Sequence, residues 1–329
     1  MTKPAFLITI DTEGDNLWQN HRNIATENTR FLPRFQALCE KYQFKPTWLT
    51  NYEMARDPAY VEFARDVITR QQGEVGMHLH AWNSPPEYPL TDDDWKWQPY
   101  LIEYPDDQLI AKVRFMTELL EESFQTPMRS HRAGRWAFDE RYAAILSKLG
   151  YCVDCSVTPR VNWAFNSGAP QGNGGTDYTH FPRQAYFIDP EDISRPGSHG
   201  LLEVPMSTDY KHSPMVTRLK QGVDKLRGRH RSPSVYWLRP SRDNLPAMKR
   251  VVERNLAAGS DYVEFMLHSS EFMPGGSPTF KTAADIEALY ANLEQLFSWL
   301  HSRTTGMTLF EYYQSYITRQ AESPRSIRR

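Results

Sequence analysis

The chain has 329 residues, of which 40% are hydrophobic and 24% charged, and its formal net charge is −2. This composition is typical of a globular protein with a large core, and the charge gives no reason to expect nucleic acid or an anionic membrane as a partner. The sequence shows no signal peptide and no apolar run near the about 18 residues of a membrane span. Its three cysteines suggest no disulfide framework. We therefore expect a cytoplasmic protein without an integral membrane segment.

Short apolar or β-branched segments alternate with amphipathic helical patterns along the whole chain. Proline at the start and glycine just past the end mark several of the helices. We expect strands at 5–11, 46–50, 74–80, 128–133, 151–157, 201–206, 234–240 and 262–268. We expect helices at 27–42, 58–72, 106–124, 139–150, near 214–227, at 243–258 and at 283–303.

Roughly eight strands alternating with helices predict an α/β fold with a mostly parallel sheet. The first strand–helix turn, "DTEGDNLWQN", lacks the glycine pattern of a dinucleotide-binding fold, so a closed or nearly closed barrel is favoured over an open doubly wound sheet. Two long segments of loop composition interrupt the alternation. Without a domain linker in sight, we expect one barrel domain over 1–329 with loop insertions at about 81–105 and 159–200.

Acids and imidazoles stand where two of these strands end. Asp11 and Glu13 close the first strand, and His78 and His80 close the third. Residues two apart on a strand point to the same face, so each pair can reach inward to one ion. Two imidazoles and a carboxylate leave coordination positions open, as in catalytic metal sites. The second acid can then take a proton from water that a divalent cation has made more acidic.

Two further strands end in Arg132 and His268, which are also typical of hydrolytic active sites. Each motif alone has a plainer explanation. An H-x-H can be structural, D-x-E can cap the next helix, and a lone histidine more often serves packing. The joint pattern favours a metal site, because all of these groups fall at the ends where a barrel collects its catalytic residues.

At this point the chain resembles a known family. "TIDTEGD", "GEVGMHLHAW", "RAGRW" and "FMLHSSEF" are similar, in order, to the motifs of the NodB-homology polysaccharide deacetylases, carbohydrate esterase family 4. The H-x-H followed by Trp and Asn resembles the branch containing the lipopolysaccharide-biosynthesis protein WalW. The resemblance covers residues 5 to about 310. It implies a distorted β/α barrel, one divalent metal ion and removal of acyl groups from amino sugars.

Carried over by position, the resemblance makes Asp11 the catalytic base and Glu13 the acidic metal ligand, with Glu in place of the family's usual Asp. His78 matches the first histidine ligand. The family's second histidine lies four residues further on, where this chain has Trp82, so His80 must substitute. We expect zinc as the ion, with cobalt, nickel, manganese or iron as alternatives.

The same resemblance makes Arg132 the arginine that orients the base and His268 the general acid. Arg239, in "WLRPSRD", matches a substrate-side motif weakly. Together with Trp82 and Trp136, it is a candidate for substrate binding.

Other residues keep two interpretations each. Asp15 is either a third metal ligand or, as we favour, a turn acid; Asp154 either supports a catalytic group or meets a backbone donor. Trp82, Trp95 and Trp97 either stack on sugars or pack the long loops.

The sequence thus predicts a metal-dependent amidohydrolase that removes an acetyl or formyl group from an amino sugar. We expect its substrate to be a nucleotide- or lipid-linked precursor in lipopolysaccharide or other surface-glycan biosynthesis. One alternative is hydrolysis of another non-peptide C–N bond in a small cyclic or linear amide. Another is a non-catalytic sugar-binding protein on the same barrel.

Overall fold

The computed structural model describes residues 3–19, 21–198, 200–212, 215–216 and 234–322. The main sheet has the strand order β11-β1-β2-β3-β4-β5-β8-β6-β7, with β12 paired to β1. From β11 to β8 every pairing is parallel, whereas β6 and β7 extend the sheet as an antiparallel hairpin. The strands of this sheet are β1 (Ala5–Thr12), β2 (Pro46–Thr50), β3 (Glu74–Leu79), β4 (Ser130–Ala133), β5 (Val153–Asp154), β6 (Tyr186–Asp189), β7 (Asp192–Pro196), β8 (Leu202–Glu203), β11 (Tyr262–His268) and β12 (Thr305–Met307).

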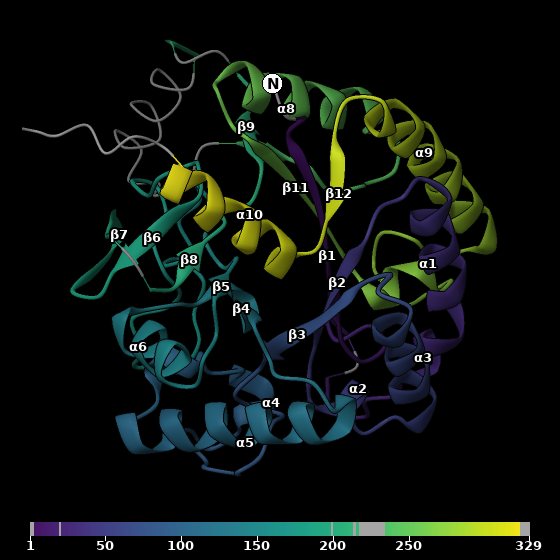
Figure 1. Ribbon diagram of the computed structural model, residues 1–329. Coiled ribbons are helices and arrows are strands. Elements are labelled where there is room, and N and C mark those ends of the chain that lie inside the picture. The colour runs from purple at the N-terminus through teal and green to yellow at the C-terminus, as the bar shows by residue number, and fades with distance from the viewer. Residues whose placement is uncertain (1–2, 20, 199, 213–214, 217–233, 323–329) are drawn as a thin grey trace, which may run out of the picture.

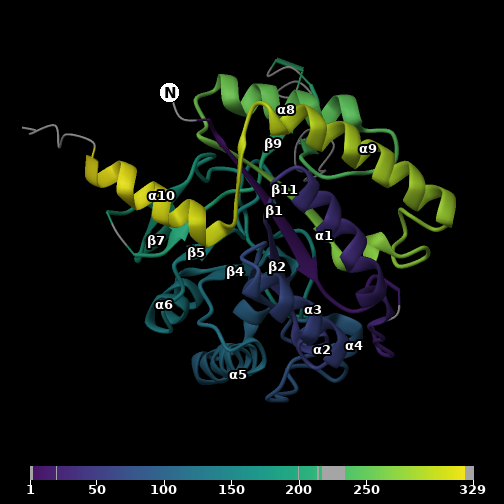
Figure 2. The same ribbon diagram turned by 45° about the vertical axis from the view of Figure 1, so that its right-hand side comes forward.

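Most of the helices cover the outer side of the curled sheet (Figures 1 and 2). They follow the strands in sequence, as in other α/β folds. The longer ones are α1 (Leu32–Lys41), α3 (Pro58–Thr69), α5 (Asp106–Phe124), α6 (Glu140–Lys148), α8 (Leu245–Ala257), α9 (Ala283–His301) and α10 (Leu309–Glu322). Short helices are α2 (Tyr52–Ala55) and α4 (Asp94–Trp97), with 3-10 turns at Glu27–Phe31, Leu101–Glu103, Gly134–Trp136 and Ser269–Phe272. No helix in the described part of the chain is long and apolar enough to cross a membrane.

Strand β1 is buried along its whole length, and its two faces have different neighbours. Phe6, Ile8 and Ile10 belong to the large apolar cluster under the helices. Ala5 and Leu7 belong to a second cluster inside the curve of the sheet, which α10 also enters. Because side chains alternate along a strand, the inward series continues past Leu7 to the acids at the end of the strand.

The predicted distorted barrel is confirmed, and its closure is irregular. Between β8 and β11 the gap is bridged by single backbone hydrogen bonds: Leu238 donates to Ser207 (3.0 Å) and Met266 donates to Leu238 (3.3 Å). The segment 234–240 was expected as a strand of the main sheet. Its strand β10 (Val235–Trp237) instead pairs antiparallel with β9 (Thr208–Tyr210) in a separate two-stranded sheet.

Other differences are local. The hairpin of β6 and β7 lies inside the segment 159–200 that was expected as loop. Helix α10 was not predicted at all. The helix expected near 214–227 falls largely outside the described residues.

Candidate functional site

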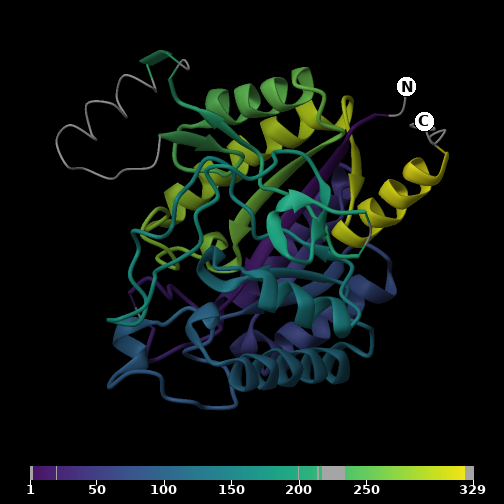
Figure 3. The same cartoon turned by 90° about the vertical axis from the view of Figure 1, so that its left-hand side faces the viewer.

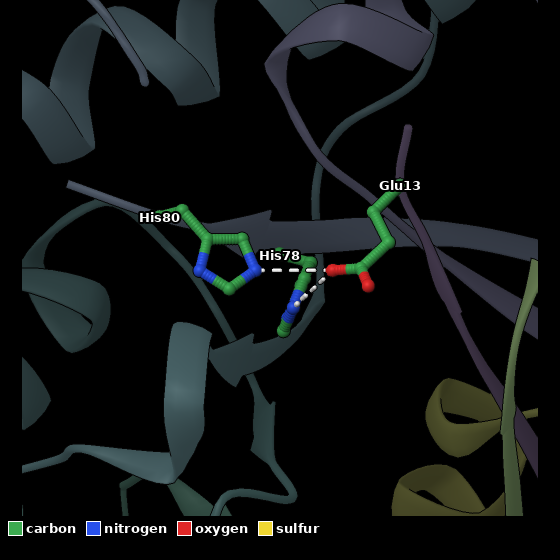
Figure 4. Close-up of side chains that lie close together, drawn as sticks. All are labelled: Glu13, His78 and His80. Atoms are coloured by element: carbon green, nitrogen blue, oxygen red, sulfur yellow. Dashed lines mark hydrogen bonds and ion pairs between the residues drawn. The ribbon is translucent and has the colours of Figure 1, made fainter. Parts of the chain in front are cut away.

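The carboxyl ends of the parallel strands bring the predicted metal ligands together. Glu13 follows β1, while His78 lies in β3 and His80 follows it; all three side chains are buried. Nε2 of His80 is 3.1 Å from Oε2 of Glu13, and Nε2 of His78 is 3.6 Å from the same oxygen. Figure 4 shows both imidazoles pointing at this carboxylate. Gly134 permits the arrangement, because a Cβ at this position would lie 2.8 Å from Nδ1 of His80.

The three side chains fit a divalent ion. Their candidate donor atoms all lie within 4.8 Å of one another. Tetrahedral zinc with ligands at about 2.0–2.2 Å would separate its donors by about 3.3 Å, close to the spacings seen here. Nδ1 of His78 lies 3.0 Å from the carbonyl oxygen of Arg132, a contact that leaves Nε2 free to bind the ion. The Glu–His–His set could therefore hold a metal ion.

Asp11 lies beside these ligands and is held by a buried arginine. Strand register pairs Asp11 with His268, and His78 with Arg132. Nη1 of Arg132 donates to Oδ1 of Asp11 at 2.5 Å, and its Nη2 donates to Oε1 of Glu264. Oδ2 of Asp11 remains 4.0 Å from Nε2 of His78. One carboxylate oxygen is thus fixed by the guanidinium, and the other faces the candidate ion.

Electrostatics keep both acids ionised. Burial alone would raise their pKa values. Arg132, His78 and His268 nevertheless hold the pKa of Asp11 below its usual value. The pKa of Glu13 is likewise lowered, by His268, His78 and His80. A carboxylate in this state can bind a cation or accept a proton at neutral pH.

His268 approaches the same two acids from β11. Its Nε2 is 3.9 Å from Oδ2 of Asp11 and 3.9 Å from Oε1 of Glu13. On the other side of the ring, Nδ1 is 3.2 Å from Oε2 of Glu271, and Arg239 lies 3.0 Å from that oxygen and 3.1 Å from Nδ1. The N–H group at Nδ1 can donate a hydrogen bond to Glu271. In this orientation of the ring, Nε2 is the nitrogen that faces Asp11 and Glu13.

These groups line a cavity of about 360 Å³, within the size range of small-molecule sites. Trp82, Trp136 and Arg239, predicted as substrate contacts, are all in its wall. Trp95 packs against Trp82 at 5.3 Å and, like Trp97, is not among the described lining residues.

The two undecided acids have other partners. The Asp15 carboxylate accepts hydrogen bonds from the backbone of Glu27 and Asn28, which favours the turn interpretation. The Asp154 carboxylate meets the Ser156 backbone at 2.9 Å and is 2.5 Å from Nδ1 of His131, so it has both a backbone donor and a side-chain partner.

Sequence reasoning missed several residues of the site. Glu271 stands three positions after His268 in "FMLHSSEF", a spacing that could have indicated the contact. Glu264 is hidden in the middle of an apolar strand, where its in-facing position follows only from the register with β1. Trp18 and Trp163 lie in irregular segments whose position no local pattern could predict.

No protein-family model and no curated protein sequence matches this chain. Solved structures do match it, at low identity. A protein from Mycobacterium smegmatis assigned to the polysaccharide deacetylases covers 100% of this chain with 95% of its own length, at 13% identity and a TM-score of 0.53. One from Parabacteroides distasonis, assigned as a glycoside hydrolase/deacetylase, covers 96% with 72% of its length, at 11% identity and a TM-score of 0.60.

A 4-alpha-glucanotransferase from Thermococcus litoralis also aligns, over 96% of this chain and 40% of its own, at 12% identity and a TM-score of 0.54. The chain therefore has the NodB-like barrel found among polysaccharide deacetylases. Since a transferase has a similar fold, function must be argued from the site itself.

Proposed function

Starting from this fold, we propose that the protein is a metal-dependent hydrolase that removes an N-acyl group from an amino sugar. The observation that carries the proposal is the placement of Asp11 and His268 beside the Glu13–His78–His80 cluster, with 3.9 Å between Oδ2 of the aspartate and Nε2 of the histidine. Binding a sugar needs no such acid–base pair, so the non-catalytic alternative is disfavoured.

In the proposed mechanism Glu13, His78 and His80 hold the ion. When bound, the ion supplies Lewis acidity towards the acyl oxygen and lowers the pKa of water. Asp11 accepts the proton of the attacking water on Oδ2, while Arg132 keeps the other oxygen in place.

His268 has the opposite task. An amine cannot leave as an anion, so a protonated Nε2 must donate to the leaving nitrogen. Glu271 orients the ring by accepting a hydrogen bond from Nδ1, and Arg239 holds the Glu271 carboxylate by donating to its Oε2.

For the substrate we propose an amino-sugar precursor of lipopolysaccharide or another surface glycan, carrying an acetyl or formyl group and linked to a nucleotide or lipid. Zinc is the proposed ion and the cytoplasm the proposed location. The choice of substrate rests on the resemblance to the WalW branch.

The test is release of acetate or formate from acylated amino-sugar conjugates by the zinc-loaded protein. We expect release that stops on chelation, returns with zinc and is lost in Asp11→Asn. Small cyclic amides form a parallel arm. Turnover of those amides with no sugar substrate turned over would support hydrolysis of another C–N bond, and no turnover of either class would contradict the proposal.

A further inference from the structure

The two long insertions, 81–105 and 159–200, are joined to each other beside the Glu13–His78–His80 cluster. The hydroxyl of Tyr100 in the first donates to the backbone carbonyl of Asn166 in the second, at 3.1 Å. The Glu103 carboxylate also accepts from the Ala169 backbone at 3.0 Å. Figure 3 shows the teal segment 159–175 running down to the blue insertion. Tyr100 and Asn166 both line the cavity, so this junction forms part of its wall.

Arg135, in the 3-10 turn Gly134–Trp136 that follows β4, links the same two insertions. Its guanidinium donates to the carbonyl of Gln98 in one and to that of Ser167 in the other, the latter at 2.9 Å. It also lies 4.1 Å from the centre of the Tyr100 ring. Arg135 and Trp136 both adopt left-handed backbone angles, with φ of 53° and 63°. Consecutive residues in this strained region are typical of functional sites.

Next to Arg135 and its bonds to the two insertions, which we call the clip, aromatic rings continue the wall of the cavity. Trp136 contacts Trp237 with ring centres 5.6 Å apart, and Trp163 contacts the same ring at 6.3 Å. Two residues after Trp237, Arg239 reaches His268. A series of contacts therefore connects the insertions to His268, the proposed general acid.

A second series of contacts leads from His268 back to the first insertion. Trp18 packs edge-on against His268 with ring centres 4.7 Å apart. His21, from the same loop, lies 6.2 Å from Trp82, where the insertion 81–105 begins. Trp18, which is 43% exposed, and His21 thus lie between His268 and the start of the first insertion.

From this wall of contacts we infer that the site is closed on one side, so that it admits the end of a glycan or a single sugar conjugate and excludes the internal sugars of a polymer. We call this one-sided site the cup. An internal sugar would need two openings on opposite sides, one for each neighbouring ring. The wall made by Tyr100, Asn166 and Arg135 closes one of them. The inference rests on the proposed function and narrows its substrate class to terminal N-acylated amino sugars.

The test compares methyl N-acetylglucosaminide with the linear hexasaccharide of N-acetylglucosamine, using zinc-loaded full-length protein. Mass-spectrometric fragmentation locates the free amine in the hexasaccharide. We expect it only in a terminal ring. Calorimetry with zinc-loaded Asp11→Asn supplies a readout that needs no turnover, and we expect affinity to rise less than about tenfold from one ring to six, because further rings stay outside the cup.

Variants of the clip sharpen the test. In Arg135→Ala the ratio of internal to terminal deacylation should rise by at least about tenfold, because the wall loses its link between the insertions. Tyr100→Phe removes only the hydroxyl that bonds to Asn166, and should raise the ratio less. Arg65→Ala is the matched control, since Arg65 also donates to a backbone carbonyl, at 2.7 Å, but on the outer surface at α3.

The outcomes are distinct. Free amines in internal rings of the wild-type product, or affinity that grows with every added ring, would overturn the cup and leave the deacylase intact. Failure of both probes to bind and to react would contradict the proposed function and the cup with it. An Arg135→Ala ratio equal to that of Arg65→Ala would overturn the role of the clip.

Discussion

Acids at the two ends of the same parallel strands have different neighbours. At the amino end, the half-buried Glu74 opens β3 and accepts hydrogen bonds from neutral donors. Its oxygens accept from the Ser130 hydroxyl at 2.5 Å and the Phe310 backbone at 3.0 Å, and burial raises its pKa. At the carboxyl end, Glu13 has imidazoles as neighbours and its pKa is lowered. Burial alone therefore does not identify a functional acid, whereas its partners do.

Helix α10 crosses the amino end, and its Leu309 and Tyr312 pack against Ala5, Leu7 and Tyr262 inside the sheet. The carboxyl end has a cavity lined by the charged side chains described above. One end is built for stability and the other for chemistry, and substitutions at the two ends should separate these properties.

The largest effect is expected from Asp11→Asn. Loss of a general base should lower kcat by about 10²–10⁴-fold, while bound zinc stays near one per chain. Steady-state rates and metal analysis would check this. Glu74→Gln is the control from the other end and should leave kcat near the wild-type value. A fully active Asp11→Asn would contradict the role of the base.

Next in size is Leu309→Ala, which leaves a cavity where α10 packs inside the sheet. We expect the free energy of unfolding to fall by about 2–5 kcal/mol, with KM unchanged, as measured by urea denaturation and kinetics. Ile317→Ala, on the same helix but 39% exposed, should cost less than about 0.5 kcal/mol. Equal costs for the two variants would contradict the packing of α10 inside the sheet.

At the active end, Glu271→Gln should lower kcat about tenfold to a hundredfold with little change in KM. The glutamine keeps the shape but not the charge that orients and stabilises a protonated His268. The alkaline limb of the pH–rate profile should move to lower pH as well, because the amide no longer favours a protonated imidazole. Ser270→Ala is the neighbouring control; its hydroxyl is buried without a hydrogen-bond partner among the described residues. Identical profiles for both variants would contradict a positioning role for Glu271.

The smallest effect concerns Glu264, between the two ends. Burial raises the pKa of Glu264 to about 7, more than Arg132 lowers it. The native state therefore keeps a proton that the unfolded chain loses, and this group makes the free energy of unfolding fall as pH rises from about 4.5 to about 7. Glu264→Gln should show a smaller fall in urea denaturation across that range. A fall as large as in the wild type would contradict this assignment.

Much of this fold could be predicted from local pattern. The helix 106–124 was placed correctly because nineteen residues repeat an amphipathic period, and the strand 262–268 because a long β-rich run precedes a histidine. Helix α10 was missed although Thr308 and Glu311 exchange reciprocal backbone bonds, a capping box that the sequence T-x-x-E encodes. The displaced strand at 234–240 depends on how the barrel closes, which local pattern does not contain.

The candidate site shows the same limit. Glu13, His78 and His80 could be grouped because strand alternation fixes which way each side chain points. Glu264 and Arg135 could not, since their roles depend on contacts with segments far away in sequence: Glu264 with Thr9 and Arg132, and Arg135 with both insertions.

The most direct test of the central claim is an anomalous-scattering map, at the zinc edge, of crystals grown from zinc-loaded protein. The account predicts one ion, about 2.0–2.2 Å from Nε2 of His78, Nε2 of His80 and a carboxylate oxygen of Glu13. An ion held by other residues, or no ion at this position at saturating zinc, would contradict it.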